Sequence, residues 1–289
     1  MKLATLPKID AFKDGLGGVY QVVKALYKHM PTLGWEITAP EAADIIHCLC
    51  TDSHKYVDVY TNVGWLYGKT PWEMEARIGM KYNLDHAAVV TAPSIYMADL
   101  LMGIRDREIR VIPNGVDCAE WSPVSPLPYI LWGKVGAEFG RNRDACMLAL
   151  EVAQMLPKRQ FVFTVVPQGV SPPANVKMLG LMPHDRWAEW MRSATVYLAT
   201  GLEPGAVAVV EALAAGVPVA SIDEGATQEY IAWDCGLVGH TAREIAECVE
   251  ELWRERKKYG KRAYEQAQQF DWAKIMPDYV NAYKAAIGD

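Results

Sequence analysis

The feature that most constrains the fold is the alternation of short apolar runs with longer amphipathic segments. Runs such as KLATLP (2–7) and AVVTAP (88–93) are rich in apolar and β-forming residues, whereas GGVYQVVKALYKHM (17–30) has apolar residues at helical spacing. Strands that alternate with helices form parallel sheets, because each parallel connection crosses over the sheet and its helix covers a face. The sequence therefore predicts an α/β fold built on parallel strands.

The alternation stops at WSPVSPLP (121–128), which has three prolines within eight residues. Proline is excluded from helix interiors and central strands, so this stretch is predicted to be a linker. A second alternating series follows, from YILWGKV (129–135) to VPVASI (217–222), and the end of the chain has a helical pattern. Two α/β domains in tandem place a ligand cleft between them, at the carboxyl ends of their strands.

Composition excludes several classes of protein. The chain of 289 residues is 51% hydrophobic and 22% charged, which is typical of a soluble globular protein, and it has no apolar run of membrane-spanning length. The opening MKLATLPKIDAFKDG has charges on both sides of a very short apolar stretch, unlike a signal peptide. The net charge is −6 and neither half is basic, which argues against a general nucleic-acid surface.

The cysteines and histidines give no sign of a metal site. The six cysteines are scattered without a CxxC pair, and no His-x-x-x-His spacing accompanies an acidic residue. We therefore expect reduced thiols in a cytoplasmic protein without a structural metal.

Two glycine-rich stretches lie between predicted strands and helices. In DGLGGVY (14–20) the glycines would let backbone approach an anion, but Tyr20 stands where GxGxxG needs its third glycine, and a tight turn explains the pattern equally well. GKVGAEFGRNR (133–143) carries three cations that would suit a diphosphate, although a solvated basic loop is an equal alternative: Lys134, Arg141 and Arg143.

The stretch LEPGAVAVVEALAAGVPVAS (202–221) contains two carboxylates, Glu203 and Glu211, separated by seven residues. Glu211 lies in a segment with small or apolar residues on every side, which predicts a helix buried against a sheet. Burying an unpaired carboxylate costs several kcal/mol, so Glu211 needs hydrogen-bond donors. Ribose or sugar hydroxyls are suitable donors that the chain does not supply; a lysine partner or solvent is the alternative. Glu203 is predicted to lie in a loop, where it could stay solvated.

These residues resemble a known motif. EPGAVAVVE (203–211) is similar to the E-x7-E motif of retaining glycosyltransferases of the GT-B fold, especially glycosyltransferase family 4. VIPNGVD (111–117), GGVYQVVKAL (17–26) and FDWAKIMPDYVNAYKAA (270–286) resemble further parts of that family in the same order.

The resemblance implies two Rossmann-like domains that face each other across a cleft. Residues 1–120 would form the acceptor-side domain, and a C-terminal helix within 272–289 would pack back onto it. Residues 121–271 would form the domain that binds the nucleotide sugar.

The resemblance also implies a hexosyltransferase that moves a sugar from a nucleotide-diphosphate donor, UDP- or GDP-linked, to an acceptor hydroxyl. The anomeric configuration would be retained, and no metal or other cofactor would be needed. Glu203 would contact the transferred sugar, and Lys134 and Arg141 would contact the phosphates. The other implied substrate-binding residues are Glu211 for the ribose hydroxyls, the amides of Gly205, Ala206 and Val207 for the diphosphate, Gly17 and Gly18 from the first domain, and Asn114.

The chain departs from the family at Val63, which stands where a histidine is usual. His47, His54 or Asp14 could replace that histidine, or each could be a structural or surface residue. The first domain is also short for the family, which suits a bulky acceptor or a partner protein. The alternative function is a degenerate glycosyltransferase that binds a sugar nucleotide or a partner without transfer. The acceptor stays open among sugars, lipids, small molecules, proteins and modified DNA bases.

Overall fold

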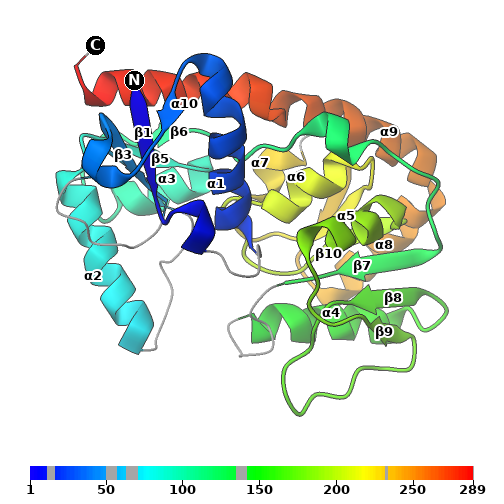
Figure 1. Ribbon diagram of the computed structural model, residues 1–289. Coiled ribbons are helices and arrows are strands. Elements are labelled where there is room, and N and C mark those ends of the chain that lie inside the picture. The colour runs from blue at the N-terminus through cyan, green and yellow to red at the C-terminus, as the bar shows by residue number, and fades with distance from the viewer. Residues whose placement is uncertain (12–16, 50–56, 63–70, 135–141, 232–233, 289) are drawn as a thin grey trace. The chain divides into compact units, whose positions relative to one another are not determined.

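The protein is represented by a computed structural model, which divides into two compact units (Figure 1). Unit 1 comprises Met1–Gly115 and Trp272–Asp289, and unit 2 comprises Val116–Asp271. Each unit contains one six-stranded parallel sheet, which confirms the predicted α/β fold class. The structure describes residues 1–11, 17–49, 57–62, 71–134, 142–231 and 234–288.

The sheet of unit 1 has the strand order β2-β1-β3-β4-β5-β6, so the direction in which successive strands are added across the sheet reverses between β1 and β3. Its strands are β1 (Lys2–Leu6), β2 (Glu36–Ile37), β3 (Ile45–Cys48), β4 (Val59–Thr61), β5 (Val89–Ala92) and β6 (Arg110–Val111). Its helices are α1 (Gly18–His29), α2 (Pro71–His86), α3 (Ile95–Met102) and α10 (Trp272–Ala286), with short 3-10 turns at Ile9–Ala11, Met30–Leu33 and Pro40–Ala42.

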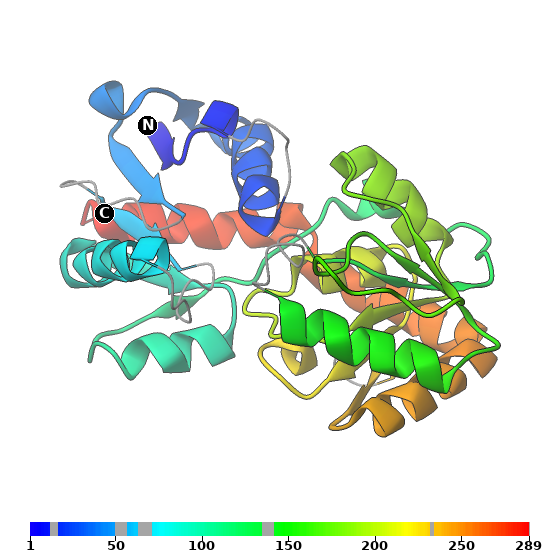
Figure 2. The ribbon, with the colours of Figure 1, turned by 90° about the horizontal axis from the view of Figure 1, so that it is seen from below.

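Helix α10 belongs to unit 1 although it closes the chain. It contacts α1, β4 and β5, and Figure 2 shows it as the long red helix beside the strands of this unit. Its buried side chains recur at helical spacing and include two tyrosines, Tyr279 and Tyr283, that are fully buried. The apolar face of α10 therefore completes the core of unit 1.

The sheet of unit 2 has the strand order β12-β11-β10-β7-β8-β9. Its strands are β7 (Tyr129–Trp132), β8 (Gln160–Phe163), β9 (Val176–Met178), β10 (Val196–Ala199), β11 (Val219–Ile222) and β12 (Gly236–Gly239). Its helices are α4 (Arg143–Met155), α5 (His184–Ser193), α6 (Val207–Ala214), α7 (Thr227–Tyr230), α8 (Ala242–Arg254) and α9 (Arg256–Ala267), with 3-10 turns η4 (Cys118–Trp121) and η6 (Gln268–Phe270).

The order in unit 2 is that of a dinucleotide-binding Rossmann sheet, with the topological switch point between β7 and β10. Helices α4 and α8 contact each other on one face of the sheet, whereas α6 contacts α5 and α9 on the other face (Figure 1). Ligands of such sheets bind at the carboxyl ends of the strands beside the switch point. The first place to look for a site in unit 2 is therefore the end of β7 and the end of β10.

The division between the units lies between Gly115 and Val116, earlier in the chain than the predicted boundary at 120/121. The reason is local pairing inside unit 2: the Val116 amide donates to the Phe270 carbonyl at 2.9 Å, and the Cys118 amide donates to Asp271 Oδ2 at 3.2 Å. The proline-rich residues 122–128 have no regular secondary structure and lie within unit 2.

Three elements differ from the sequence-based expectation. The helical pattern of 241–269 predicts one long segment, but the structure has two helices that meet at Glu255. The short helix α7 and the strand β12 were not predicted. β12 has the sequence GLVG, which carries little strand signal, and it forms because β11 offers a paired edge with Ala220 opposite Leu237.

Candidate functional site

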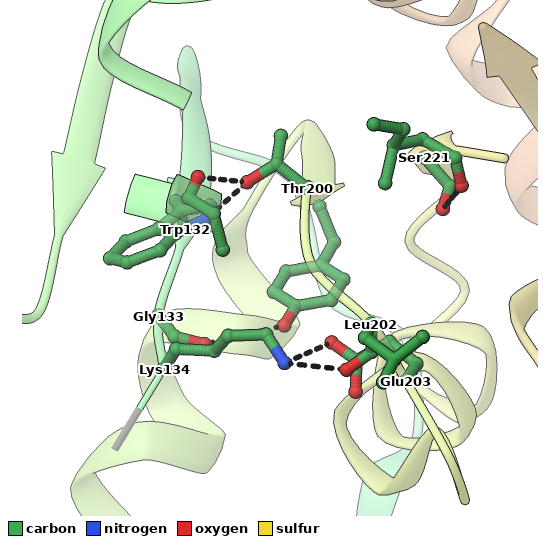
Figure 3. A network of polar contacts seen from close by, with 10 residues as sticks. Trp132, Gly133, Lys134, Thr200, Leu202, Glu203 and Ser221 are labelled. Carbon is green, nitrogen blue, oxygen red and sulfur yellow. Dashed lines mark hydrogen bonds and ion pairs between the residues drawn. The ribbon is translucent and has the colours of Figure 1, made fainter. Parts of the chain in front are cut away.

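A lysine and a glutamate meet at the carboxyl ends of β7 and β10. Lys134 Nζ lies 3.0 Å from Glu203 Oε1 and donates a second bond to the Leu202 carbonyl at 3.2 Å (Figure 3). The side chain of Lys134 is 15% exposed and that of Glu203 is 11% exposed. A loop position would have allowed Glu203 to stay solvated, but the structure largely buries its carboxylate and pairs it with a charged side chain that follows another strand.

Two glycines explain why this pair fits. A Cβ at Gly201 would lie 2.7 Å from Lys134 Cε, so only a glycine leaves room for the lysine stem. Gly225, with φ of +72°, forms a β-bridge with Glu203, and a Cβ there would lie 2.8 Å from the Glu203 amide nitrogen. The backbone of Glu203 is fixed further by the Ala226 amide, which donates to its carbonyl at 2.8 Å.

The strands beneath the pair are joined by a buried threonine. Trp132 Nε1 at the end of β7 donates to Thr200 Oγ1 at 2.9 Å, and that hydroxyl donates to the Ala145 carbonyl of α4 at 2.6 Å (Figure 3). Because every polar group in this chain of bonds is paired, the ends of β7 and β10 are held together rigidly.

The second glutamate of the motif, Glu211, lies on α6 with its side chain 6% exposed. Its two oxygens each accept a hydrogen bond from α5: Oε1 from His184 Nε2 at 2.7 Å and Oε2 from Trp187 Nε1 at 2.8 Å. The burial of Glu211 agrees with the sequence, but the expectation that the chain supplies no donor is wrong. Two ring N–H groups stabilise the buried charge.

Trp187 is wedged between the sheet and Glu211. A Cβ at Gly133, the residue after β7, would lie 2.6 Å from Trp187 Cζ3, so the indole passes directly over this glycine. On its other side the indole packs edge-on against Tyr197 of β10, with ring centroids 6.3 Å apart and planes at 83°. The indole therefore has little room to turn away from Glu211.

Tyr197 lies near both glutamates. Burial and the nearby charges of Glu203 and Glu211 raise the pKa of its hydroxyl well above the usual value, so it stays protonated. The hydroxyl donates a long hydrogen bond, 3.5 Å, to the Gly133 carbonyl. Through Tyr197 and Trp187 the two glutamates belong to one continuous cluster.

Sequence reasoning missed His184, Trp187 and Tyr197. The first two lie in HDRWAEW (184–190), where an i, i+3 spacing would place two ring N–H donors on one face of a helix. That spacing was the available signal, but their acceptor is more than twenty residues away along the chain. Tyr197 lies inside an apolar strand and carried no signal of its own.

The other implied binding residues divide between the units. Gly205 and Ala206 are buried at the start of α6, Ala206 has a left-handed φ of +46°, and Val207 is the first residue of the helix. Gly17 and Gly18 belong to unit 1, where Gly17 has φ of +91° and precedes α1. Asn114 is buried in unit 1. Arg141, Val63, His54 and Asp14 lie outside the described residues.

His47, one of the proposed substitutes for the family histidine, is a structural residue. It is fully buried on β3, and hydrogen bonds join its Nδ1 to the Tyr283 hydroxyl at 2.9 Å and its Nε2 to Thr61 Oγ1 at 2.7 Å. Burial lowers the pKa of the imidazole to about 3, so it is neutral near pH 7. With both ring nitrogens occupied in the core, it has no access to a substrate.

Three further observations concern the part of the chain that the structure describes. No cluster of three or more histidine, cysteine, aspartate or glutamate side chains there could hold a metal ion. None of the described helices combines the length and apolar character needed to cross a membrane. The five cysteines described are free thiols.

Comparison with known proteins supports a relation to glycosyltransferases. Residues 168–270 match the model of the family described as "Glycosyl transferases group 1". A stretch of 120 residues is 29% identical to a phosphatidyl-myo-inositol mannosyltransferase of Propionibacterium freudenreichii subsp. shermanii, and it covers 39% of this chain and 32% of that protein. The matched stretch is therefore about a third of the relative's length.

Solved structures match over the whole chain. Sucrose-phosphate synthase from Thermosynechococcus elongatus has a TM-score of 0.78 at 15% identity, covering 99% of both chains. Anabaena HepE, solved in complex with UDP-glucose, has a TM-score of 0.70 at 15% identity, covering 99% of this chain and 100% of that one. The fold is GT-B. Within it, the matched range 168–270 contains both glutamates of the motif and the two α5 donors of Glu211, whereas Lys134 precedes it.

Proposed function

We propose that this protein is a glycosyltransferase that transfers a hexosyl group from a nucleotide-diphosphate sugar to an acceptor hydroxyl, with retention of the anomeric configuration. The observation that carries the proposal is the placement of Glu203, Glu211 and Lys134. These three charged, largely buried side chains gather at the strand ends beside the β7–β10 switch point. Buried charges at such a point are costly for stability and are typical of a binding site.

The leaving group in this reaction is a nucleoside diphosphate, on which negative charge grows as the glycosidic bond breaks. Lys134 places a cation at the strand ends, and its flexible stem lets Nζ turn from Glu203 toward a phosphate. The start of α6 adds positive potential through the amides of Gly205, Ala206 and Val207. The N-cap residue of this helix is Ala206, whose methyl side chain makes no capping hydrogen bond. Lysine and helix amides would thus supply the stabilisation that a metal supplies elsewhere.

Glu211 would bind the donor ribose. A carboxylate has about four acceptor sites, and His184 and Trp187 use one on each oxygen, which leaves capacity for the two ribose hydroxyls. We propose UDP or GDP as the nucleotide, and the UDP-glucose complex of the structural neighbour HepE favours UDP.

Glu203 would contact the transferred sugar. In the proposed front-face reaction the acceptor oxygen forms its bond to the anomeric carbon on the face from which the phosphate oxygen leaves. The acceptor proton passes to the departing phosphate, so atoms and charge balance without a protein base. A carboxylate beside the anomeric centre stabilises the positive charge that develops on the sugar ring. The acceptor stays open among the classes named above.

A screen of thermal stability with UDP-, GDP- and ADP-sugars tests the proposal. We expect one nucleotide class to raise the melting temperature of the wild-type protein, since a ligand that binds the folded state stabilises it. Donor turnover should then survive chelation of metals by EDTA and be lost in Glu203→Gln. Proton NMR of the product would show whether the anomeric configuration is retained. Absence of both stabilisation and turnover with all three classes would overturn the proposal.

A further inference from the structure

We infer that His184 and Trp187 are positioning residues that fix the Glu211 carboxylate in the orientation that receives the donor ribose. The inference rests on the proposed function, because it concerns how the same site is prepared for its substrate. It concerns two residues of α5 that are not part of the E-x7-E motif.

The geometry of the two bonds makes them a clamp. His184 and Trp187 lie one turn apart at the start of α5, and each donates to a different oxygen of Glu211, at 2.7 and 2.8 Å. A carboxylate held by one donor can rotate about that bond, whereas two donors on separate oxygens fix the plane of the group. The clamp therefore defines which acceptor sites of Glu211 remain for a ligand.

Both donors are supported from behind. The Trp187 indole lies against Gly133 and Tyr197, and the His184 ring packs edge-on against Trp121 of η4, with centroids 5.7 Å apart and planes at 69°. Trp121 is buried. Side chains that are packed in this way hold their hydrogen bonds without further loss of rotamer freedom when a substrate arrives.

The clamp also explains why a glycine stands at position 133. Any larger residue there would push the indole away from the end of β7, toward or past Glu211. Gly133, which directly follows β7, thus links the Lys134 side of the cluster to the Glu211 side.

The inference predicts that loss of a clamp residue weakens nucleotide binding more than it slows the chemical step. The ribose is remote from the anomeric carbon, so its contacts are made equally in the ground state and the transition state, and losing them raises KM rather than lowering kcat. A residue whose role is only to stabilise the fold would lower the amount of active protein instead, with KM unchanged.

The experiment is titration calorimetry of the full chain with UDP, GDP and ADP, followed by a series of variants with whichever nucleotide binds. Trp187→Phe keeps the aromatic wedge but removes the donor, and we expect about tenfold weaker binding, typical of one lost bond to a charged group. Trp190→Phe is the matched control: it lies on the same helix and packs on Tyr129 and Lys177, and the two described hydrogen bonds of Glu211 come from His184 and Trp187 instead. This control should bind like the wild type.

His184 provides a second, independent arm. His184→Gln places an amide N–H near the position of Nε2 and should keep most of the affinity, whereas His184→Leu should lose about tenfold. The His184 side chain is 24% exposed, so these variants test the clamp even if Trp187→Phe fails to fold. In a Glu211→Ala background, neither Trp187→Phe nor His184→Leu should weaken binding further, because Glu211→Ala has already removed the carboxylate that both side chains bond. The comparison is a double-mutant cycle.

The outcomes distinguish a failure of the proposed function from a failure of the clamp on Glu211. If wild-type protein binds none of the three nucleotides, the proposed function and the clamp both fall. If wild-type protein binds and Glu211→Ala binds more weakly, but Trp187→Phe and His184→Leu match the wild type, the clamp alone is overturned. Additive losses in the Glu211→Ala background would also overturn it.

Discussion

Unit 1 and unit 2 each fold around a six-stranded parallel sheet with one switch point, yet they bury different kinds of polar groups. In unit 1 the polar side chains beneath α10 are neutral: His47 on β3, Thr61 on β4, Thr91 on β5 and Tyr283 on α10 form a connected hydrogen-bond network. In unit 2 the cluster at the ends of β7 and β10 includes three charged side chains, Lys134, Glu203 and Glu211.

The difference teaches how to separate a structural cluster from a functional one. The side chains of the unit 1 network hydrogen-bond to one another and carry no charge. Burial lowers the pKa of His47 to about 3 and raises that of Tyr283, so both groups stay neutral near pH 7. Such a network costs little to bury and fixes the packing of α10. The unit 2 cluster keeps charges in largely buried positions, and a fold tolerates this cost where a ligand uses the charge.

The largest expected effect is on transfer activity. Lys134→Met removes the ammonium group at the strand ends while keeping the volume of the side chain. We expect kcat to fall by a factor of about 10²–10³, as for other groups that stabilise developing charge. Steady-state kinetics with the donor identified by the thermal screen measures it. Met at position 134 leaves Glu203 unpaired, so thermal denaturation checks that the variant folds. A wild-type kcat in Lys134→Met would show that the Lys134 charge does not serve catalysis.

The next effect concerns acid stability of unit 1. The unfolded chain takes up a proton on His47 below a pH of about 6.5, whereas the folded protein resists protonation down to a pH of about 3. Unfolding therefore becomes easier as pH falls through this window, by about 1.4 kcal/mol per pH unit, or about 2 kcal/mol between pH 6.5 and pH 5.

Urea unfolding at pH 7 and pH 5 measures this decrease in unfolding free energy. His47→Gln, which cannot be protonated, should lose about 2 kcal/mol less of its unfolding free energy between the two conditions than the wild type does. An equal loss in the two proteins would mean that His47 is not held neutral in the folded state.

A glycine substitution tests the connection between the two sides of the unit 2 cluster. Gly133→Ala brings a Cβ within 2.6 Å of the Trp187 ring, and overpacking of this kind costs about 1–3 kcal/mol of unfolding free energy. Because the indole has to shift, nucleotide affinity should fall as well. Gly103→Ala in unit 1, where a Cβ would meet ordinary contacts at 3.4 Å, is the control and should change neither quantity. Unchanged stability and affinity in Gly133→Ala would contradict the close packing of the Trp187 indole on Gly133.

The smallest effect is the loss of one neutral hydrogen bond. Tyr283→Phe removes the hydroxyl that bonds His47 Nδ1, and we expect a loss of about 1–2 kcal/mol of unfolding free energy, since a buried nitrogen is left unpaired. Thermal denaturation measures the change. Nucleotide affinity, measured in parallel, should stay at the wild-type value; a large drop in affinity would show that the neutral network also serves the site.

The sequence was sufficient for the architecture and for the burial of Glu211. The alternation of apolar runs and amphipathic segments predicts parallel sheets, and the apolar segment around Glu211 predicts a buried carboxylate there. Local pattern carries this information, because strand and helix periodicity and the cost of burying a charge depend on neighbours along the chain.

The partners of Glu211 could not be predicted in the same way. Trp187 lies on a helix that is separated from Glu211 by a strand and a loop, so their contact depends on how α5 and α6 pack on the sheet. The break at Glu255 between α8 and α9 is another example, since it has neither proline nor glycine to mark it. Tertiary packing decides both features.

The central claim is that the β7 and β10 ends of unit 2 bind a nucleotide-sugar donor. Hydrogen–deuterium exchange of the full chain, with and without the nucleotide sugar selected by the thermal screen, tests it most directly. The account predicts slower exchange in peptides that cover α5 and the segment from Gly201 to Glu211, with no change in the peptide of β4 in unit 1. Exchange that is unchanged around Glu203 and Glu211 at saturating nucleotide sugar would contradict it.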